Sequence, residues 1–339
     1  MSLQILVTGG AGFIGSNFIR LVLNKRPEYR VTNLDKLTYS GNLNNLSDLS
    51  ENPRYQFIHG SICDTDTVSR LVEAADAIVH FAAESHVDRS IDDSTPFIDT
   101  NVCGTQVLLE AVRRIGGRRF VHVSTDEVYG SLPIDRPDLL FTEESSISPN
   151  SPYAASKASS DLLVRAYYQT FGVDAVTTRC SNNYGPYQFP EKLIPNFVTR
   201  LAQGLQVPVY GDGRNVRDWI HVEDHCRAVM CVLERGISGE CYNIGSDNEH
   251  SNIELTKQLI EIMGLNSSYI NYVKDRLGHD HRYGICSEKI RSTLGWKPKH
   301  TDWFTALQST VQWYLDNEFW WQSVADGSYQ SAGQESGLS

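Results

Sequence analysis

Tyr153 and Lys157 are four residues apart in a segment whose pattern predicts a helix, and at this spacing two side chains share one helix face. A phenol titrates near ~10 in water, which is too high for a base at neutral pH, but a nearby ammonium lowers its pKa by favouring the phenolate. The pair is therefore a candidate general base for the proton of a hydroxyl group. Because Tyr-x-x-x-Lys also arises by chance on amphipathic helices, its interpretation depends on the elements around it.

Two adjacent carboxyl groups, Asp126 and Glu127, directly follow Thr125 at the end of a predicted strand. Neighbouring carboxyl groups can divide the roles of acid and base when their environments hold one protonated and the other ionised. The alternative is a strand-end pair that faces water. A tyrosine and a lysine in the same site favour the catalytic interpretation, because groups with perturbed pKa values gather at functional sites.

A glycine-rich turn joins the first predicted strand to the first predicted helix, with glycines at Gly9, Gly10, Gly12 and Gly15. The pattern Gly-x-Gly-x-x-Gly permits a tight turn and a close approach to a pyrophosphate, while the helix N-terminus supplies amides and a partial positive charge. The second strand ends at Asp35, where a carboxylate can bind an adenosine ribose. Asp35 would repel a 2′-phosphate, so NAD is favoured over NADP, although Lys36 softens that preference. The alternative is a glycine-rich turn that binds nothing.

The elements that position these residues alternate up to about residue 180, with short β-branched runs followed by longer amphipathic stretches. Strands are predicted at 4–8, 30–34, 55–58, 77–81, 120–124 and 175–178, and helices at 14–25, 65–74, 100–115 and 153–171. Right-handed crossovers would place these helices on both faces of the sheet. The predicted fold class is α/β, with a doubly wound parallel Rossmann sheet over residues 1–180.

The alternation loosens beyond residue 180, which predicts a smaller C-terminal α/β substrate-binding region over 181–324, with helices at 222–234, 252–263 and 303–317. The chain is expected to return to the first domain around 218–245. Residues 131–150, rich in Pro, Asp and Ser, predict a long surface loop. The final stretch, 325–339, lacks periodicity and predicts a disordered tail.

Charge and composition limit the partners. The formal net charge of -11 argues against a nucleic acid, whose affinity for proteins comes mainly from clustered Lys and Arg. The chain shows no targeting segment and no apolar run long enough for a membrane span, so we expect a cytoplasmic protein. Seven scattered cysteines predict reduced thiols and no disulfide framework.

His221 and His225 are four residues apart and could suggest a metal site. The segment does not match His-Glu-x-x-His, and a third ligand at a suitable spacing is missing. Histidines at the start of a helix, with their hydrogen bonds satisfied, are the favoured interpretation, and no metal is expected.

Together these motifs resemble the extended short-chain dehydrogenase/reductase family, in which Thr125, Tyr153 and Lys157 match the Thr/Ser-Tyr-Lys triad. The acid pair Asp126 and Glu127 is similar to that of the sugar-nucleotide 4,6-dehydratases and is lacking in the related epimerases. Further segments agree with the dehydratases that act on dTDP-glucose: 82–90, 181–186, 190–195, 217–219 and 275–280. The resemblance spans the chain except for its tail.

The resemblance implies an NAD-dependent hydro-lyase that converts dTDP-glucose to dTDP-4-keto-6-deoxyglucose. Tyr153, assisted by Thr125 and Lys157, would take the proton of the C4 hydroxyl while hydride passes to NAD+. Glu127 would then remove the C5 proton and Asp126 would protonate the departing C6 hydroxyl, before hydride returns to C6. It also implies a homodimer through the helices near 100–115 and 153–171.

The binding residues are likewise implied by the resemblance. NAD is expected at Gly9, Gly10, Gly12, Phe13, Ile14, Gly15, Asp35, Lys36, Thr38, Ser61, Ile62, Phe81, Ala82, Ala83, Ser85, Thr100, Tyr153, Lys157 and Asn183. The nucleotide-sugar substrate is expected at Ser85, Thr125, Asn182, Lys192, Leu193, Pro208, Tyr210, Arg217, Asn252, Asp275, Arg276, His279 and Tyr283.

Two positions depart from the pattern of the relatives. Ser61 precedes Ile62 where many relatives carry Asp, so a contact to the adenine amino group is lost or rerouted. Leu277 stands where a Pro is often found, which alters the loop near the nucleotide. Three alternatives stay open: a dehydratase for UDP-glucose, a sugar-nucleotide epimerase or decarboxylase on the same scaffold, and a non-catalytic NAD-binding sensor.

Overall fold

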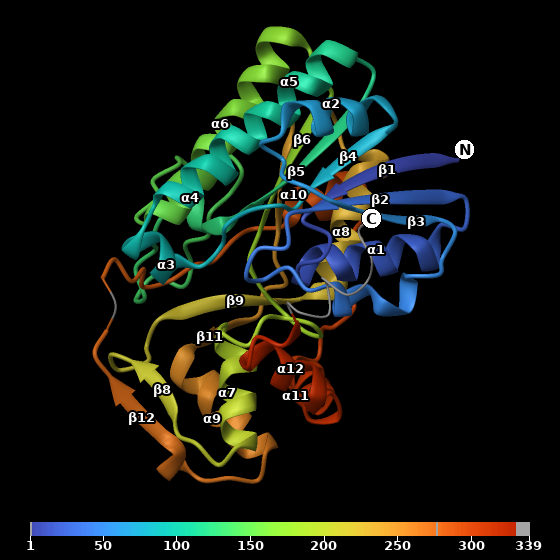
Figure 1. Ribbon diagram of the computed structural model, residues 1–339. Coiled ribbons are helices and arrows are strands. Elements are labelled where there is room, and N and C mark those ends of the chain that lie inside the picture. Colours follow the sequence, from blue (N-terminus) through green and yellow to red (C-terminus); the bar gives the residue numbers. More distant parts are fainter. Residues whose placement is uncertain (1, 276, 330–339) are drawn as a thin grey trace.

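A computed structural model describes residues 2–275 and 277–329 of the chain. Seven parallel strands form the central sheet in the order β10-β6-β5-β4-β1-β2-β3 (Figure 1). Their bounds are β1 Leu3–Thr8, β2 Tyr29–Asp35, β3 Tyr55–His59, β4 Ala77–His80, β5 Arg119–Thr125, β6 Ala175–Cys180 and β10 Cys241–Ile244. The doubly wound Rossmann fold is thereby confirmed, and the six strands expected from the sequence are all present.

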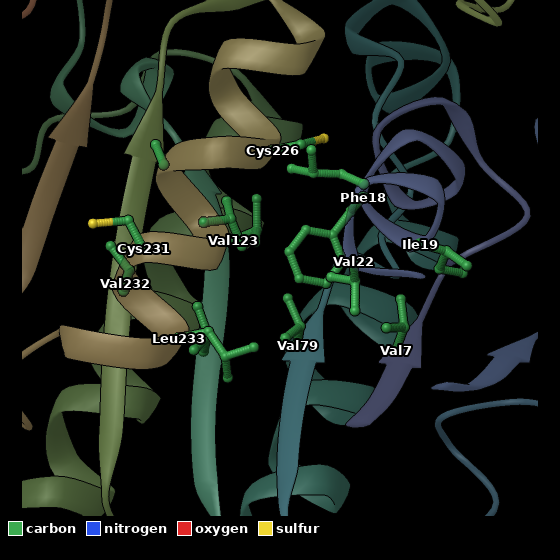
Figure 2. Close-up of a cluster of buried hydrophobic side chains, with 14 of the residues drawn as sticks. Val7, Phe18, Ile19, Val22, Val79, Val123, Cys226, Cys231, Val232 and Leu233 are labelled. Carbon is green, nitrogen blue, oxygen red and sulfur yellow. The ribbon is translucent and has the colours of Figure 1, made fainter. Parts of the chain in front are cut away.

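Helices cover both faces of the sheet because neighbouring strand residues point to opposite sides. Val7 packs in a core with Phe18 and Val22 of α1 (Phe13–Lys25) and with residues of α8 (Val222–Arg235) and α10 (Glu288–Leu294). Figure 2 shows this side of the sheet, with α1 and α8 over the strands. Leu6 points the other way, into a core with α2 (Thr65–Glu73), α5 (Thr105–Ile115) and α6 (Pro152–Phe171).

The smaller region lies below the carboxyl ends of the main strands (Figure 1). A three-stranded sheet has the order β11-β9-β7, and a two-stranded sheet pairs β12 with β8. The bounds are β7 Asn182–Tyr184, α7 Leu193–Ala202, β8 Val207–Tyr210, β9 Val216–His221, β11 Glu249–Ser251, α9 Asn252–Ile262, β12 Ile270–Val273, α11 Trp303–Asp316 and α12 Glu318–Ala325. A separate apolar core joins α7, α9 and α11.

Short helical segments complete the described chain: η1 Leu43–Leu49, α3 Val87–Asp92, α4 Thr95–Phe97, η2 Ile98–Gly104, η3 Asp126–Tyr129 and η4 Ser267–Tyr269. The segment η2 is a π-helix that runs directly into α5, so the helix expected at 100–115 is divided between two helix types.

The chain crosses between the two regions more than once. Residues 222–244 supply α8 and the seventh strand, β10, to the main sheet, while residues 218–221 belong to β9 of the smaller sheet. A second return is made by α10, whose Ile290 and Leu294 join the core beneath α8. A boundary at 181 therefore separates the two regions only along the sequence, because β10, which follows it, belongs to the main sheet in space.

The loop over 131–150 contains no helix or extended strand and is pinned by isolated bridges from Leu132 to Arg282 and from Phe141 to Ile285. Residues 325–329, which were expected to belong to a disordered tail, lie within the described part: α12 ends at Ala325, and Tyr329 is buried and donates to the carbonyl of Tyr39. Residues 330–339 lie outside the described part. Within that part, no helix is both long and apolar enough to cross a membrane.

Tyr314 on α11 tests how the C-terminal helices are held. Its side chain is fully buried and its hydroxyl donates to the carbonyls of Gln188, at 2.8 Å, and Gly185, at 3.2 Å. Tyr314→Phe leaves these carbonyls without a donor, so we expect a loss of about 1–3 kcal/mol in the free energy of unfolding, measured by urea denaturation. The control is Tyr272→Phe, at a residue 58% exposed, with an expected change within about 0.5 kcal/mol. Equal stability of the two variants would contradict this role of Tyr314.

Candidate active site

A cleft with a volume of about 300 Å³ opens at the carboxyl ends of β1, β2, β4, β5 and β6. Ligands of doubly wound sheets bind at this edge, outside the ends of the strands. The glycine-rich turn lines one part of the cleft, and Tyr153 and Lys157 line another. The structure thus brings together motifs that are more than a hundred residues apart in sequence.

Close backbone packing explains the glycines of the turn. Gly9 has φ +72°, and a Cβ there would lie 2.6 Å from the main chain of Ala82. A Cβ on Gly15 would lie 2.3 Å from the carbonyl oxygen of Gly9. Any larger residue at either position would push α1 away from the strand ends, and with it the amides at the helix N-terminus.

The carboxylate of Asp35 is buried at the end of β2 and is held by the turn itself. It accepts hydrogen bonds from the amides of Ala11, at 2.9 Å, and Leu37, at 2.8 Å. Burial raises the pKa of Asp35, and these two amides oppose the rise. Asp35 therefore braces the glycine-rich turn and also lines the cleft where an adenosine ribose would lie.

Thr125 connects the sheet to the acid pair. It forms the last rung of β5 opposite Cys180 and is the N-cap of η3, where its hydroxyl accepts from the amide of Glu127 at 3.2 Å. The cap starts a short helix at the sheet edge, so Asp126 and Glu127 occupy its first turn and both line the cleft. Thr125 also hydrogen-bonds the phenol of Tyr153.

Tyr153 lies in the first turn of α6, whose start is fixed by Ser151 at the N-cap and Pro152 at the first helical position. The hydroxyl of Ser90 accepts from the amide of Tyr153 at 3.2 Å. The phenol is 8% exposed and faces the cleft. The capped start of α6 and the contact with Ser90 of α3 therefore both restrict the position of Tyr153.

The pKa of Tyr153 differs from the expectation drawn from its spacing to Lys157. Burial raises the pKa well above that of a phenol in water, and the charge of Glu127 adds to the rise. Lys157 is buried as well, which lowers its pKa to about 8, and its ammonium donates to the carbonyl of Val123 at 2.8 Å. The loss of solvent is the largest effect on the phenol, so the phenol by itself favours its protonated form.

Asp126 and its neighbour are in different environments, as a division of acid and base roles requires. Asp126 is 1% exposed, and burial raises its pKa well above the ordinary value. The charges of Glu127 and Asp218 add to the rise, while that of Arg217 opposes it. This environment favours the protonated form of Asp126, which is the form that can donate a proton.

Most of the residues expected from the sequence meet at this one cleft. Its lining includes all five expected catalytic residues and, of the expected cofactor residues, Gly9, Gly12, Phe13, Ile14, Gly15, Asp35, Lys36, Thr38, Ser61, Ile62, Phe81, Ala82, Ala83, Ser85, Thr100, Tyr153, Lys157 and Asn183. Gly10 lies behind the turn, where a Cβ would meet Asn33 Oδ1 at 2.3 Å. Of the expected substrate residues, Ser85, Thr125, Asn182 and Lys192 line the cleft.

The other expected substrate residues lie outside the lining of this cleft: Leu193, Pro208, Tyr210, Arg217, Asn252, Asp275, His279 and Tyr283. Several of them form a second group in the smaller region, where the ring of Tyr210 meets His279 edge to face at 6.2 Å and His279 is 2.6 Å from the carboxylate of Asp275. Arg217 is buried and its guanidinium stacks on Tyr283 at 4.3 Å. Arg276 lies outside the described residues.

Segments from both regions meet across the cleft, and sequence analysis missed several of the residues involved. Tyr39 lines the cleft and carries the guanidinium of Arg89 on its ring at 3.7 Å. Phe189 meets Tyr39 edge to face at 5.6 Å. Glu191 accepts from Arg89 at 3.2 Å. Single aromatic and charged residues in loops carry no periodic signal, so only the fold reveals that they meet.

The departures noted in the sequence can now be located. Ser61 lines the cleft, and its hydroxyl accepts from the amide of Cys63 at 3.1 Å. Leu277 is 76% exposed.

One group of possible metal ligands occurs among the described residues, and it differs from the pair weighed in the sequence. The ligand atoms of His221, Glu223 and His300 lie within 4.8 Å of one another. His225 is absent from the group because it is fully buried and bonds to Asn183 at 2.9 Å. The Nδ1 atom of His221 accepts the amide of Glu223, as an N-cap does, so its Nε2 atom carries the proton and has no lone pair for a metal.

Comparisons with known proteins place the chain in a family. A family model described as GDP-mannose 4,6 dehydratase matches residues 6–305. A dTDP-glucose 4,6-dehydratase of Actinoplanes sp. is 52% identical over 324 residues, which cover 94% of this chain and 100% of the relative.

Two solved structures show how far the fold extends. The dTDP-glucose 4,6-dehydratase DesIV of Streptomyces venezuelae, solved with NAD bound, has a TM-score of 0.91 and 51% identity, covering 95% of this chain and 100% of that one. A UDP-glucose 4-epimerase of Thermotoga maritima, solved with UDP-glucose, has a TM-score of 0.85 at 30% identity, covering 93% and 100%. Identity near one half over nearly the whole length confirms the resemblance seen in the motifs: this chain belongs to the dTDP-glucose 4,6-dehydratase family.

Proposed function

We propose that this protein converts dTDP-glucose to dTDP-4-keto-6-deoxyglucose as an NAD-dependent hydro-lyase. The observation that carries the proposal is the position of the acid pair: Asp126 and Glu127 line the same cleft as Tyr153 and Lys157. An oxidation at C4 needs only a base and a hydride acceptor, whereas loss of water across C5 and C6 also needs a second base and an acid. The cleft supplies both sets.

The cleft residues fit NAD. The backbone at Gly9 and Gly15 is packed too closely for any Cβ, which leaves the amides at the start of α1 open to a pyrophosphate. Asp35 lines the neighbouring part of the cleft and would accept from a ribose hydroxyl while repelling a 2′-phosphate. When bound, NAD+ supplies the hydride acceptor for C4 and, once reduced, the hydride donor for C6.

In the first step Tyr153 takes the proton of the C4 hydroxyl. Because the pKa of the phenol is raised, Tyr153 can act as a base only with a positive charge nearby. Lys157 supplies that charge from the next turn of α6. The hydroxyl of Thr125, hydrogen-bonded to the phenol, stabilises the phenolate that results. Lys157 must therefore stay protonated for this step.

In the second step the ketone at C4 acidifies the C5 proton, and Glu127 removes it. Asp126, protonated because it is buried beside other carboxylates, donates to the departing C6 hydroxyl. The two roles cannot be exchanged freely, since a protonated Asp126 is a poor base. The elimination leaves a double bond between C5 and C6. Hydride would then return to C6 while the protonated Glu127 gives its proton back to C5, which completes the product.

The second group of polar and aromatic residues is proposed to hold the nucleotide. Tyr210 and His279 are suited to contact a base, and Asn252 and Asp275 offer polar groups nearby. Lys192 and Arg217 would pair with the diphosphate. The ammonium of Lys192 lies 3.0 Å from the carbonyl of Ser85, at the junction between this group and the catalytic cleft. Leu193, Pro208 and Tyr283 would pack around them.

A homodimer in the cytoplasm is part of the proposal. Leu162 on α6 is more than half exposed, as is expected of an apolar side chain on a helix that pairs with a second copy. Size-exclusion chromatography with light scattering would measure the mass of the assembly.

Substrate turnover gives the direct test. The purified protein, incubated with dTDP-glucose, is expected to form a 4-keto-6-deoxy sugar nucleotide, identified by mass spectrometry as a loss of one water. UDP-glucose lacks the methyl group on the base and carries a ribose 2′-hydroxyl that dTDP-glucose does not have. The methyl group alone is worth roughly 10–200-fold in selectivity, so we expect slower turnover of UDP-glucose at equal concentration. Interconversion of the C4 epimers without loss of water would instead favour an epimerase, and binding of NAD without turnover would favour a sensor.

Glu127→Gln separates elimination from oxidation. We expect this variant to oxidise C4 and then stall, so that reduced nicotinamide accumulates on the enzyme and is seen by its absorbance. Tyr153→Phe should block the first step and give almost no reduced nicotinamide. Loss of a positioned acid or base costs on the order of a hundredfold to ten-thousandfold. Turnover of Glu127→Gln at the native rate would remove Glu127 from the mechanism.

Bound cofactor is a further expected outcome. Because hydride leaves C4 and returns to C6, NAD is regenerated in each cycle and slow release is advantageous. Protein purified without added cofactor should release NAD when denatured, measured by chromatography. A requirement for one NAD+ per product, with reduced cofactor appearing in solution, would contradict the internal return of hydride.

A further inference from the structure

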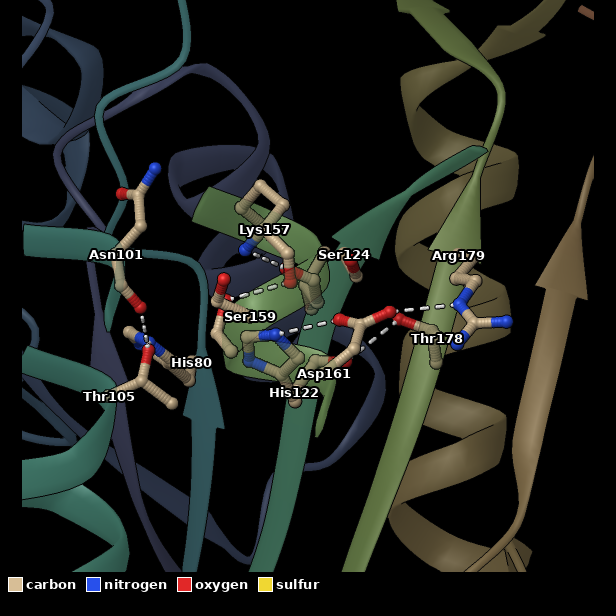
Figure 3. A network of polar contacts seen from close by, with 12 residues as sticks. His80, Asn101, Thr105, His122, Ser124, Lys157, Ser159, Asp161, Thr178 and Arg179 are labelled. Carbon is tan, nitrogen blue, oxygen red and sulfur yellow. Dashed lines mark hydrogen bonds and ion pairs between the residues drawn. The ribbon is translucent and has the colours of Figure 1, made fainter. Parts of the chain in front are cut away.

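A buried carboxylate lies one helical turn beyond Lys157 on α6. Asp161, 4% exposed, accepts from Nε of Arg179 at 2.8 Å and lies 3.2 Å from Nε2 of His122 (Figure 3). Arg179 continues the network through Nη1, which donates to the phenol of Tyr129 at 2.8 Å. None of Asp161, His122 and Arg179 lines the active-site cleft.

Charged and titratable groups surround Lys157 on two sides. On the cleft side they are Tyr153 of α6, Asp126 and Glu127 of η3, and Cys180 of β6. On the core side they are His80 of β4, His122 of β5, Asp161 of α6 and Arg179 of β6. Burial lowers the pKa values of both His80 and His122, so these imidazoles are neutral. Burial also raises the pKa of the Cys180 thiol, to about 12, which keeps it neutral.

Asp161 is the anion on the core side. Although burial acts to raise the pKa of Asp161, the contact with His122 and the charge of Arg179 hold it below the ordinary value. The ammonium of Lys157 donates a hydrogen bond to the neutral carbonyl of Val123. A carbonyl accepts a hydrogen bond but carries no net charge, so a cation here depends on charges farther away, which act strongly in a medium of low dielectric constant.

We propose that Asp161 is a positioning residue whose carboxylate keeps Lys157 in its charged form, and so keeps the phenol of Tyr153 able to act as a base. The proposal deepens the proposed function, on which it rests. The alternative is that Asp161 only pairs with Arg179 and stabilises the core. A purely structural carboxylate would alter stability without altering the protonation of Lys157.

Two variants separate charge from shape. Asp161→Asn keeps the volume and can still accept from Arg179, but it removes the negative charge. Loss of that charge disfavours the ammonium, so the pKa of Lys157 falls further from its ordinary value. Activity requires the protonated lysine, so the alkaline limb of the pH profile of kcat should move to lower pH, by about one unit for one nearby charge. At a pH on that limb kcat should fall about tenfold, while KM for dTDP-glucose stays within about twofold.

Asp161→Glu keeps the charge and disturbs the packing. Its melting temperature should fall, but its alkaline limb should stay close to that of the native protein. The matched control is Asp174→Asn, which removes a carboxylate that pairs with Arg119 at 3.1 Å at the opposite end of β5 and β6. This control should leave the pH profile unchanged.

The profiles are measured on the full-length protein with its bound NAD. An alkaline limb of Asp161→Asn that overlays the native one would falsify the proposal while leaving the proposed function intact. If Asp161→Asn does not fold, Asp161→Glu decides, because a shift of a full unit with the charge retained would overturn the role of charge. A native protein that does not turn over dTDP-glucose at all would overturn the proposed function itself.

Discussion

A buried lysine charge constrains the whole centre of this structure. Lys157 is 4% exposed, and burial lowers its pKa to about 8. An ammonium so removed from water needs compensation from groups around it, because the cost of burying an isolated charge is large. The carboxylate of Asp161 and the carbonyl of Val123 lie on the core side, and the catalytic groups lie on the other. The polar network under the site is thereby linked to the chemistry in the cleft.

Because the chain crosses between its two regions, segments from both form the hydrogen-bond network that lies beneath this buried charge. Arg179 of β6 holds Asp161 and also bonds Tyr129, whose phenol donates to Asn243 of β10 at 2.8 Å. The strand β10 arrives only after the chain has passed through the smaller region, so the support beneath Lys157 depends on segments from both. A disturbance in either region would reach the site through this network.

Local patterns allowed much of the fold to be predicted, and their limits are visible in particular residues. The helix that carries Tyr153 and Lys157 has a cap, a proline and a regular pattern, and it lies within one residue of its predicted start. The strand β10 is four residues long and was expected only as part of a return of the chain around 218–245. The contact between Tyr39 and Phe189 joins loops 150 residues apart, for which a single sequence carries no signal. The pKa of Tyr153 was expected to be lowered by the lysine and is raised, because burial cannot be judged from spacing.

The difference between dehydratase and epimerase chemistry lies in a very small part of this scaffold. The epimerase of Thermotoga maritima shares the fold at a TM-score of 0.85, so the overall fold does not select the reaction. The acid pair begins η3, where the hydroxyl of Thr125 caps the amide of Glu127. A carboxyl group placed there is fixed at the sheet edge at almost no structural cost, because the threonine that caps η3 is also the threonine of the redox triad. In the proposed mechanism, burial keeps the proton on Asp126 rather than on Glu127, and this difference enables a site that oxidises an alcohol also to expel water.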